Sequence, residues 1–139
     1  MRTILAAALS LALCGCITTS EQDLKEHPGG VYEFDTPRDF ASTFAIIQQM
    51  ANQCWIVQVS MRVVTHIDAR FDPVTRHAEL VDVMPLLVSA EHIYDVQIEG
   101  TQSGSHVRVS YLNALVKGPY ARGARHVENW VHGDLSCPD

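Results

Sequence analysis

Acidic and imidazole side chains alternate along two neighbouring stretches that the sequence predicts to be strands. His66 and Asp68 precede a turn, and His77 and Glu79 follow it. If Arg70 pairs with His77 across the turn, Asp68 lies opposite Glu79, and His66 lies one step further along the same outward face. Two carboxylates and two imidazoles on one polar sheet face are a ligand set that can bind a divalent metal ion.

The same four residues also fit an ordinary polar sheet surface. A register that differs by two residues pairs Asp68 with His77 and His66 with Glu79, which gives favourable cross-strand charge pairs without any ligand. Outward positions of a half-buried antiparallel strand are polar in any case. We therefore predict no metal site, and we keep a metal site on His66, Asp68, His77 and Glu79 as an alternative.

The sequence lacks the short motifs that mark common enzyme classes. It contains no nucleophile elbow, no phosphate-cradling glycine loop, no zinc-protease helix motif and no paired cysteine site. The composition is that of an ordinary globular chain, with 47% apolar and 19% charged residues. The net charge of −6 disfavours nucleic acid as a partner. We predict a protein that is not an enzyme and that uses no cofactor.

The first residues are typical of an export signal. Arg2 gives a positive start, and residues 4–13 form an unbroken apolar run apart from one serine. Such a run is too short to span a bilayer, which takes about 20 residues, but it fits the apolar region of a signal peptide. The motif that follows is Leu13-Cys14-Gly15-Cys16. It resembles the lipobox of bacterial lipoproteins, in which a cysteine after a small residue is lipidated before the signal is cleaved.

The resemblance to lipoproteins implies a cleavage site and a location. Residues 1–15 would be removed, and Cys16 would become the first residue and carry two or three acyl chains such as palmitate, whereas one chain alone binds a membrane only marginally. Ile17 follows, and resemblance to enteric lipoproteins then favours the periplasmic face of the outer membrane over the inner membrane. Because Arg2 leaves with the signal, the mature net charge becomes −7. The alternative is an ordinary secretory signal with Cys16 as a free or paired thiol.

Two cysteines remain after processing, Cys54 and Cys137. In an oxidising periplasm two thiols of one domain usually pair, and no choice of connectivity is left. We predict a Cys54–Cys137 disulfide. Neither residue lies in a CxxC motif or beside a second soft ligand, so the sequence gives no support for a reactive or metal-binding thiol.

The mature chain divides into a polar N-terminal segment and one domain. Residues 16–30 end in Pro-Gly-Gly and are predicted to form the lipidated cysteine and a flexible tether. Residues 31–139 form a single domain.

Two helices are predicted in this domain. The first follows Thr36 as N-cap and Pro37, and it carries an apolar face of Phe40, Phe44, Ile47, Ala51 and Cys54. The second runs from Gly118-Pro119 to His132-Gly133.

Four stretches alternate apolar and polar residues as strands do. They are residues 55–71, with at most one interruption, 77–83, 92–99 and 107–111, and residues 31–34 would add a fifth. Each has one apolar and one polar face, which is typical of an antiparallel sheet covered by helices on one side. The predicted fold is α+β, with a four- or five-stranded antiparallel meander and both helices on one face. This topology loosely resembles the helix-grip domains of other outer-membrane lipoproteins.

Three functions remain open on the sequence. The leading hypothesis is a non-enzymatic module that binds another envelope protein through a sheet face, a sheet edge or a helix groove. A carrier of a small ligand or lipid is the second, and it needs a cavity that the bulky inward side chains are expected to fill: Phe40, Phe44, Trp55, Tyr94, Tyr111 and Trp130. The third is a metal-binding domain or enzyme that uses the His66/Asp68/His77/Glu79 hairpin.

Overall fold

The structure is a computed structural model that describes residues 19–60 and 63–138. The predicted signal peptide, the lipobox and Cys16 lie outside these ranges and stay predictions. Within the described ranges, none of the helices combines the length and the apolar character that crossing a membrane requires.

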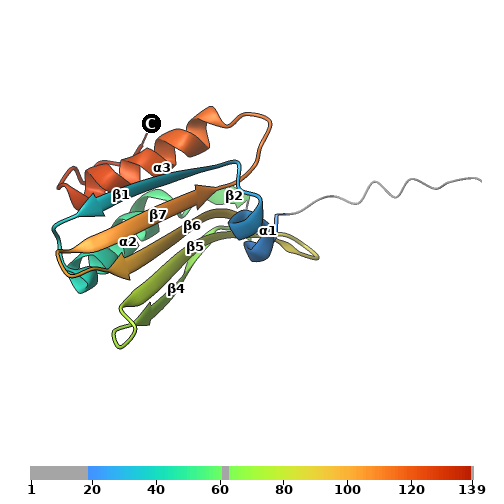
Figure 1. The fold of residues 1–139 in the computed structure, drawn as a ribbon. Helices are drawn as coiled ribbons and strands as arrows, with labels where there is room; N and C mark the ends of the chain where they lie inside the picture. Colours follow the sequence, from blue (N-terminus) through green and yellow to red (C-terminus); the bar gives the residue numbers. More distant parts are fainter. Residues whose placement is uncertain (1–18, 61–62, 139) are drawn as a thin grey trace, which may run out of the picture.

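A five-stranded antiparallel sheet in the order β1-β7-β6-β5-β4 forms the centre of the molecule (Figure 1). The four strands β4 to β7 form a meander, and β1 pairs with β7 at one edge of the sheet. A separate two-stranded sheet is formed by β2 and β3. The strands are β1 (Gly30–Thr36), β2 (Gln58–Ser60), β3 (Val63–Val64), β4 (His66–Asp72), β5 (His77–Pro85), β6 (Ala90–Gly100) and β7 (Ser105–Tyr111). The predicted α+β fold, including the fifth strand, is confirmed.

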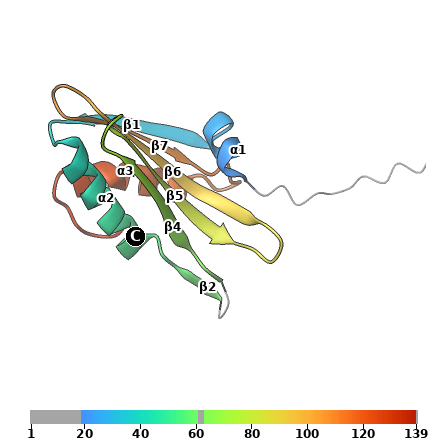
Figure 2. The same cartoon turned by 90° about the horizontal axis from the view of Figure 1, so that it is seen from below.

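Two helices cover one face of the sheet, and a short helix lies on the other. α2 (Phe40–Cys54) and α3 (Gly118–Val131) pack on the apolar face, whereas α1 (Glu21–Glu26) lies across the opposite face near one end (Figures 1 and 2). The core lies between the sheet and the two longer helices, and Leu80, Val96 and Ile47 of α2 belong to its one cluster of buried side chains.

Aromatic side chains fill the space between helices and sheet. The ring of Trp55 stacks on Tyr94 with centroids 4.3 Å apart and lies 5.2 Å from Trp130. Phe40 stacks on Phe71 of β4 at 4.9 Å. Trp55, Tyr94, Trp130 and Phe40 are buried as predicted, and two further predicted core aromatics are half-buried at its border, Phe44 and Tyr111.

The start of the first long helix differs from the prediction. Thr36 cannot cap a helix because it is the last residue of β1 and pairs with Ser105. The N-cap is Asp39, whose carboxylate accepts a hydrogen bond from the backbone N–H of Ser42 at 3.0 Å. The other helix follows the prediction, since α3 begins at Gly118 and Gly133 takes a φ of +103° just beyond its end.

Residues 55–71 do not form the long strand that their alternation predicts. Within the described residues they contribute β2, β3 and most of β4 instead. The break lies at the buried Thr65, whose hydroxyl donates to the carbonyl of Trp55 at 2.8 Å and accepts from the N–H of Val57 at 2.7 Å. The Thr65 side chain thereby holds the start of β4 against the residues that follow α2. A single regular strand over residues 55–71 would keep these two segments apart.

The prediction of a flexible tether over residues 16–30 is wrong for its second half, which forms α1 and leads into β1. Ser20 caps α1 in a reciprocal capping box with Asp23, and Leu24 of this helix is 0% exposed. Gly29 donates from its N–H to the carbonyl of Tyr111 at 2.7 Å, which leads directly into β1. A fully buried leucine contributes roughly 2 kcal/mol, so one apolar residue in a polar segment is enough to help dock it.

The predicted disulfide is present between Cys54 and Cys137. Their Cα atoms are 5.2 Å apart across a sequence separation of 83 residues. The bond joins the end of α2 to the tail after α3, and the carbonyl of Ser136 also accepts a hydrogen bond from the indole N–H of Trp130 at 2.8 Å. The tail is thereby fixed against both long helices.

Replacing both cysteines by serine is expected to lower the free energy of unfolding by about 2–4 kcal/mol, because the unfolded chain gains entropy when the cross-link is lost. Urea unfolding of the wild type and of the Cys54→Ser/Cys137→Ser variant, each with and without reductant, measures the effect. Reductant should destabilise the wild type only. Equal stability of the oxidised and reduced wild type would contradict the prediction.

Candidate binding face

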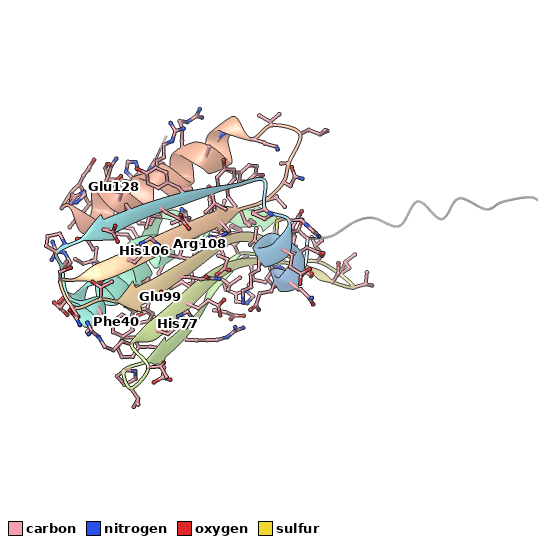
Figure 3. All side chains as sticks on the ribbon, viewed as in Figure 1. Phe40, His77, Glu99, His106, Arg108 and Glu128 are labelled. Carbon is pink, nitrogen blue, oxygen red and sulfur yellow. A yellow bond between two sulfur atoms is a disulfide. The ribbon has the colours of Figure 1, made fainter. Side chains whose placement is uncertain are left out.

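One side of the sheet is left uncovered beyond α1. We call it the open sheet face, and it is made by residues of β1, β6 and β7 whose side chains point away from α2 and α3: Glu33, Asp35, Gln97, Glu99, His106, Arg108 and Ser110. Figure 3 shows Glu99, His106 and Arg108 on this side of the sheet. Most of these residues, together with Lys25 of α1, line an open hollow of about 380 Å³.

Acidic and basic residues alternate across the strands in a first row. The register places His106 between Asp35 on β1 and Glu99 on β6, and Glu99 opposite His77 on β5. The Nδ1 of His106 lies 2.9 Å from the Oδ1 of Asp35. Neighbouring side chains of this row therefore carry opposite or neutral charge and do not repel one another.

A second row crosses all five strands. Its members in order are Glu33, Arg108, Gln97, Glu79 and Arg70. The guanidinium of Arg108 donates to the Oε1 of Glu33 at 2.8 Å, with both side chains partly in solvent. Exposed ion pairs of this kind contribute about 0–1 kcal/mol to folding. The fold thus gains little from the charges on the open sheet face, which leaves them free to serve recognition.

At one end of the open sheet face, an ion-pair network holds α1 on the sheet. The Nζ of Lys25 lies 2.5 Å from the Oε1 of the buried Glu79. The guanidinium of Arg70 donates to both carboxylate oxygens of Glu21, at 2.9 and 3.0 Å, and to the Oε2 of Glu79 at 2.6 Å. The hydrogen bonds from Arg70 are the main reason that the pKa of Glu21 falls to about 2.

Asp95 is buried beneath this network. It is 0% exposed, and its Oδ2 accepts a hydrogen bond from the side-chain amide of Gln97 at 3.0 Å. Burial, with the nearby Glu79 carboxylate, raises the pKa of Asp95. Its Oδ1 has no hydrogen-bond partner among the described residues.

Asp82 is buried on the opposite face of the sheet. It pairs in register with Tyr94, and its Oδ1 also has no partner among the described residues. Burial raises the pKa of Asp82 to about 7. Asp82 and Asp95 point to different sides of the sheet, so they do not form a pair of catalytic carboxylates.

The four residues of the metal alternative do not come together, and neither register considered for them is correct. His66 pairs with Val83, Asp68 with Val81 and Arg70 with Glu79. The Nε2 of His66 lies 3.5 Å from the Oδ1 of Asp68. His77 lies near the other end of the hairpin, opposite Asp72. No group of three or more His, Cys, Asp or Glu side chains is placed to hold a metal ion in the ranges that the structure describes.

Turn chemistry explains the register. The carboxylate of Asp72 accepts hydrogen bonds from the N–H groups of Val74 and Thr75, at 2.8 and 3.2 Å, and Arg76 takes a φ of +54°. Asp72 and His77 therefore close a four-residue loop, residues 73–76. The sequence prediction recognised the turn but not its length. Pairing Arg70 with His77 implies a two-residue loop between Asp72 and Thr75, whereas the observed loop is two residues longer and ends in the αL residue Arg76.

Several residues of the site were missed at the level of sequence. Asp82 shares the alternation of Ala78 and Leu80, which were predicted to face inward, so its burial could have been foreseen. Glu79 was expected to be an exposed outward residue, but α1 covers it. No signal marked that covering, because Leu24 is a single apolar residue in a polar segment.

Comparisons of the chain with models of protein families, with curated proteins and with solved structures gave no match. A proposal for the function therefore depends on the chemistry of the open sheet face. The face is shallow, polar and charged with both signs, which suits contact with a polar protein surface better than enclosure of a small molecule.

Asp82→Asn is expected to stabilise the protein at pH 8 and not at pH 4. The pKa of Asp82 is about 7 in the folded state against an ordinary 3.8, so only the unfolded chain releases this proton as the pH rises between these values. Wild-type stability falls across that window by at most about 4 kcal/mol, and the amide avoids this loss.

Urea unfolding at pH 4 and pH 8 measures the difference. The exposed Asp68 provides the matched control, because Asp68→Asn should have the same small effect at both pH values. An Asp82→Asn variant that is less stable than the wild type at pH 8 would show that the buried carboxylate is ionised and satisfied.

Proposed function

We propose that this protein is a lipoprotein anchored through acyl chains on Cys16 to the periplasmic face of the outer membrane, where it binds another envelope protein and catalyses no reaction. The partner docks on the open sheet face. Cys16 is the anchor because it is the cysteine that follows a small residue in the lipobox-like motif. Ile17 behind it supports sorting to the outer membrane.

The open sheet face is the observation that carries the binding proposal. It crosses three strands, and no helix of the described residues covers its exposed pairs Arg108 with Glu33 and His106 with Asp35. Arginine and histidine beside carboxylates can exchange these partners for those of another protein. The bulky aromatic side chains Trp55, Tyr94 and Trp130 are buried in the core between the sheet and the long helices, which supports a surface function over the carrier hypothesis.

Mass spectrometry of the processed protein tests the anchor. We expect an N-terminal peptide that begins at an acylated Cys16. The Cys16→Ser variant should lose the acyl mass and remain an uncleaved precursor, whereas Cys14→Ser should be acylated like the wild type and serves as the matched control. A processed wild type with an unmodified N-terminal cysteine, or with any other first residue, would refute the anchoring.

Site-specific photo-crosslinking tests the binding face. A photo-reactive amino acid at Glu99 should give a discrete protein adduct in cells, whereas one at Arg122, which is exposed on α3, should not. Arg108→Ala is expected to weaken the interaction about tenfold, as is usual for a central interface arginine. The control Arg122→Ala should leave it unchanged. Adducts from position 122 alone would move the interface to the helices and overturn the proposal.

A further inference from the structure

Two loops of the structure expose large aliphatic side chains to solvent at their tips. In the β5–β6 loop Leu87 is 99% and Val88 97% exposed, and in the β7–α3 loop Leu115 is fully and Val116 mostly exposed. Single exposed aliphatic residues are ordinary, but adjacent pairs at the tips of neighbouring loops mark a contact surface. We call Leu87, Val88, Leu115 and Val116 the aliphatic tips.

Both loops lie at the end of the sheet where α1 lies. The last pair of the β5–β6 hairpin is Pro85 with Ala90, and the N–H of Leu112, which leads into the second loop, donates to the carbonyl of Ile93 at 2.9 Å. Thr19 is held at the same end, because its carbonyl accepts from the N–H of His92 at 3.0 Å. Figure 1 shows both loops at the end of the sheet where α1 lies.

If Cys16 is acylated as proposed, its short distance along the chain from Thr19 places this end of the sheet next to the bilayer. Cys16 precedes Thr19 by three residues, which span at most about 11 Å when fully extended. An acyl group inserted through Cys16 therefore keeps Thr19, and with it the two loops, close to the lipid headgroups. Residues 84–90 and 112–116 contain no charged side chain, and Lys117 is the next residue of the second loop.

We propose that the aliphatic tips insert into the interfacial region of the membrane next to the acylated Cys16. The partner of this surface is the lipid bilayer: leucine and valine side chains leave water for the boundary between headgroups and acyl chains, and Lys117 meets the headgroup phosphates. The domain then contacts the membrane at three places, the anchor and two loops, and its orientation is fixed. This inference rests on the proposed acylation of Cys16.

Tryptophan fluorescence of the full processed lipoprotein in vesicles tests the insertion. The vesicles contain phosphatidylethanolamine and phosphatidylglycerol, with or without bromine on the acyl chains, which quenches nearby tryptophan. Leu87→Trp places the probe at a tip without disturbing packing. Val74→Trp is the matched control, because Val74 is 89% exposed in the β4–β5 loop at the opposite end of the sheet. Trp55 and Trp130 are buried and give a constant background.

We expect the emission of the added tryptophan in Leu87→Trp to shift to the blue and to lose about half its intensity in brominated vesicles, since interfacial side chains reach 5–10 Å into the headgroup boundary. Val74→Trp should show neither change. Equal quenching of both variants, or of neither, overturns the insertion while Cys16 stays acylated and the anchoring stands.

Two further outcomes separate the inference from the proposed function. A blue shift of Leu87→Trp in native membranes without quenching by brominated lipid would mean that a protein covers the tips, and it would overturn the insertion. An unmodified Cys16 in the mass spectrum of the same sample would overturn the anchoring, and the insertion with it, because nothing would then hold the tips at a bilayer.

Discussion

Leu24 of α1 is enclosed between this helix and the sheet, and its burial fixes the position of α1 on the domain. Around it, Lys25 of α1 pairs with Glu79, and Glu21 of α1 pairs with Arg70, so a helix that slid along the strands would lose both ion pairs and leave Glu79 with Arg70 alone. The segment before β1 is thereby part of the folded domain rather than a loose connection.

This constraint sets the geometry of the proposed function. A freely jointed tether would let the domain tumble and present every face in turn. A docked α1 instead leaves two residues between Cys16 and Thr19, so that under the proposed acylation the sheet would meet the membrane by one end. In the proposed orientation the strands would run away from the bilayer, and the open sheet face would point sideways along the membrane.

The sequence predicted those parts of the fold that depend on local periodicity. Leu80, Val96 and Val109 follow the period of two and are all buried, and Gly133 ends α3 as its backbone freedom requires. What it did not predict depended on partners distant in the chain. Leu24 is buried only because the sheet lies against it. Thr36 belongs to β1 rather than to the start of α2 because it pairs with Ser105.

The candidate site was predicted only in outline. A polar sheet face was expected, but its rows depend on the pairing of β1 with β7, which sequence alternation does not specify. The hairpin residues were placed in the wrong register because αL backbone at a non-glycine residue, Arg76, leaves no strong sequence signal. One such residue changes which side chains face one another along the whole of β4 and β5.

The outer position of β4 has a consequence for self-association. In the described residues this strand pairs with β5 alone, so its other side presents free backbone donors and acceptors, the pattern that invites a second copy to add strand to strand. His66, Asp68, Arg70 and Asp72 stand along it, with both signs of charge in mixed order. A copy arriving in antiparallel fashion would have to desolvate these side chains and match their sequence of charges. The charged edge thus opposes the pairing of copies into sheets that run from one molecule to the next.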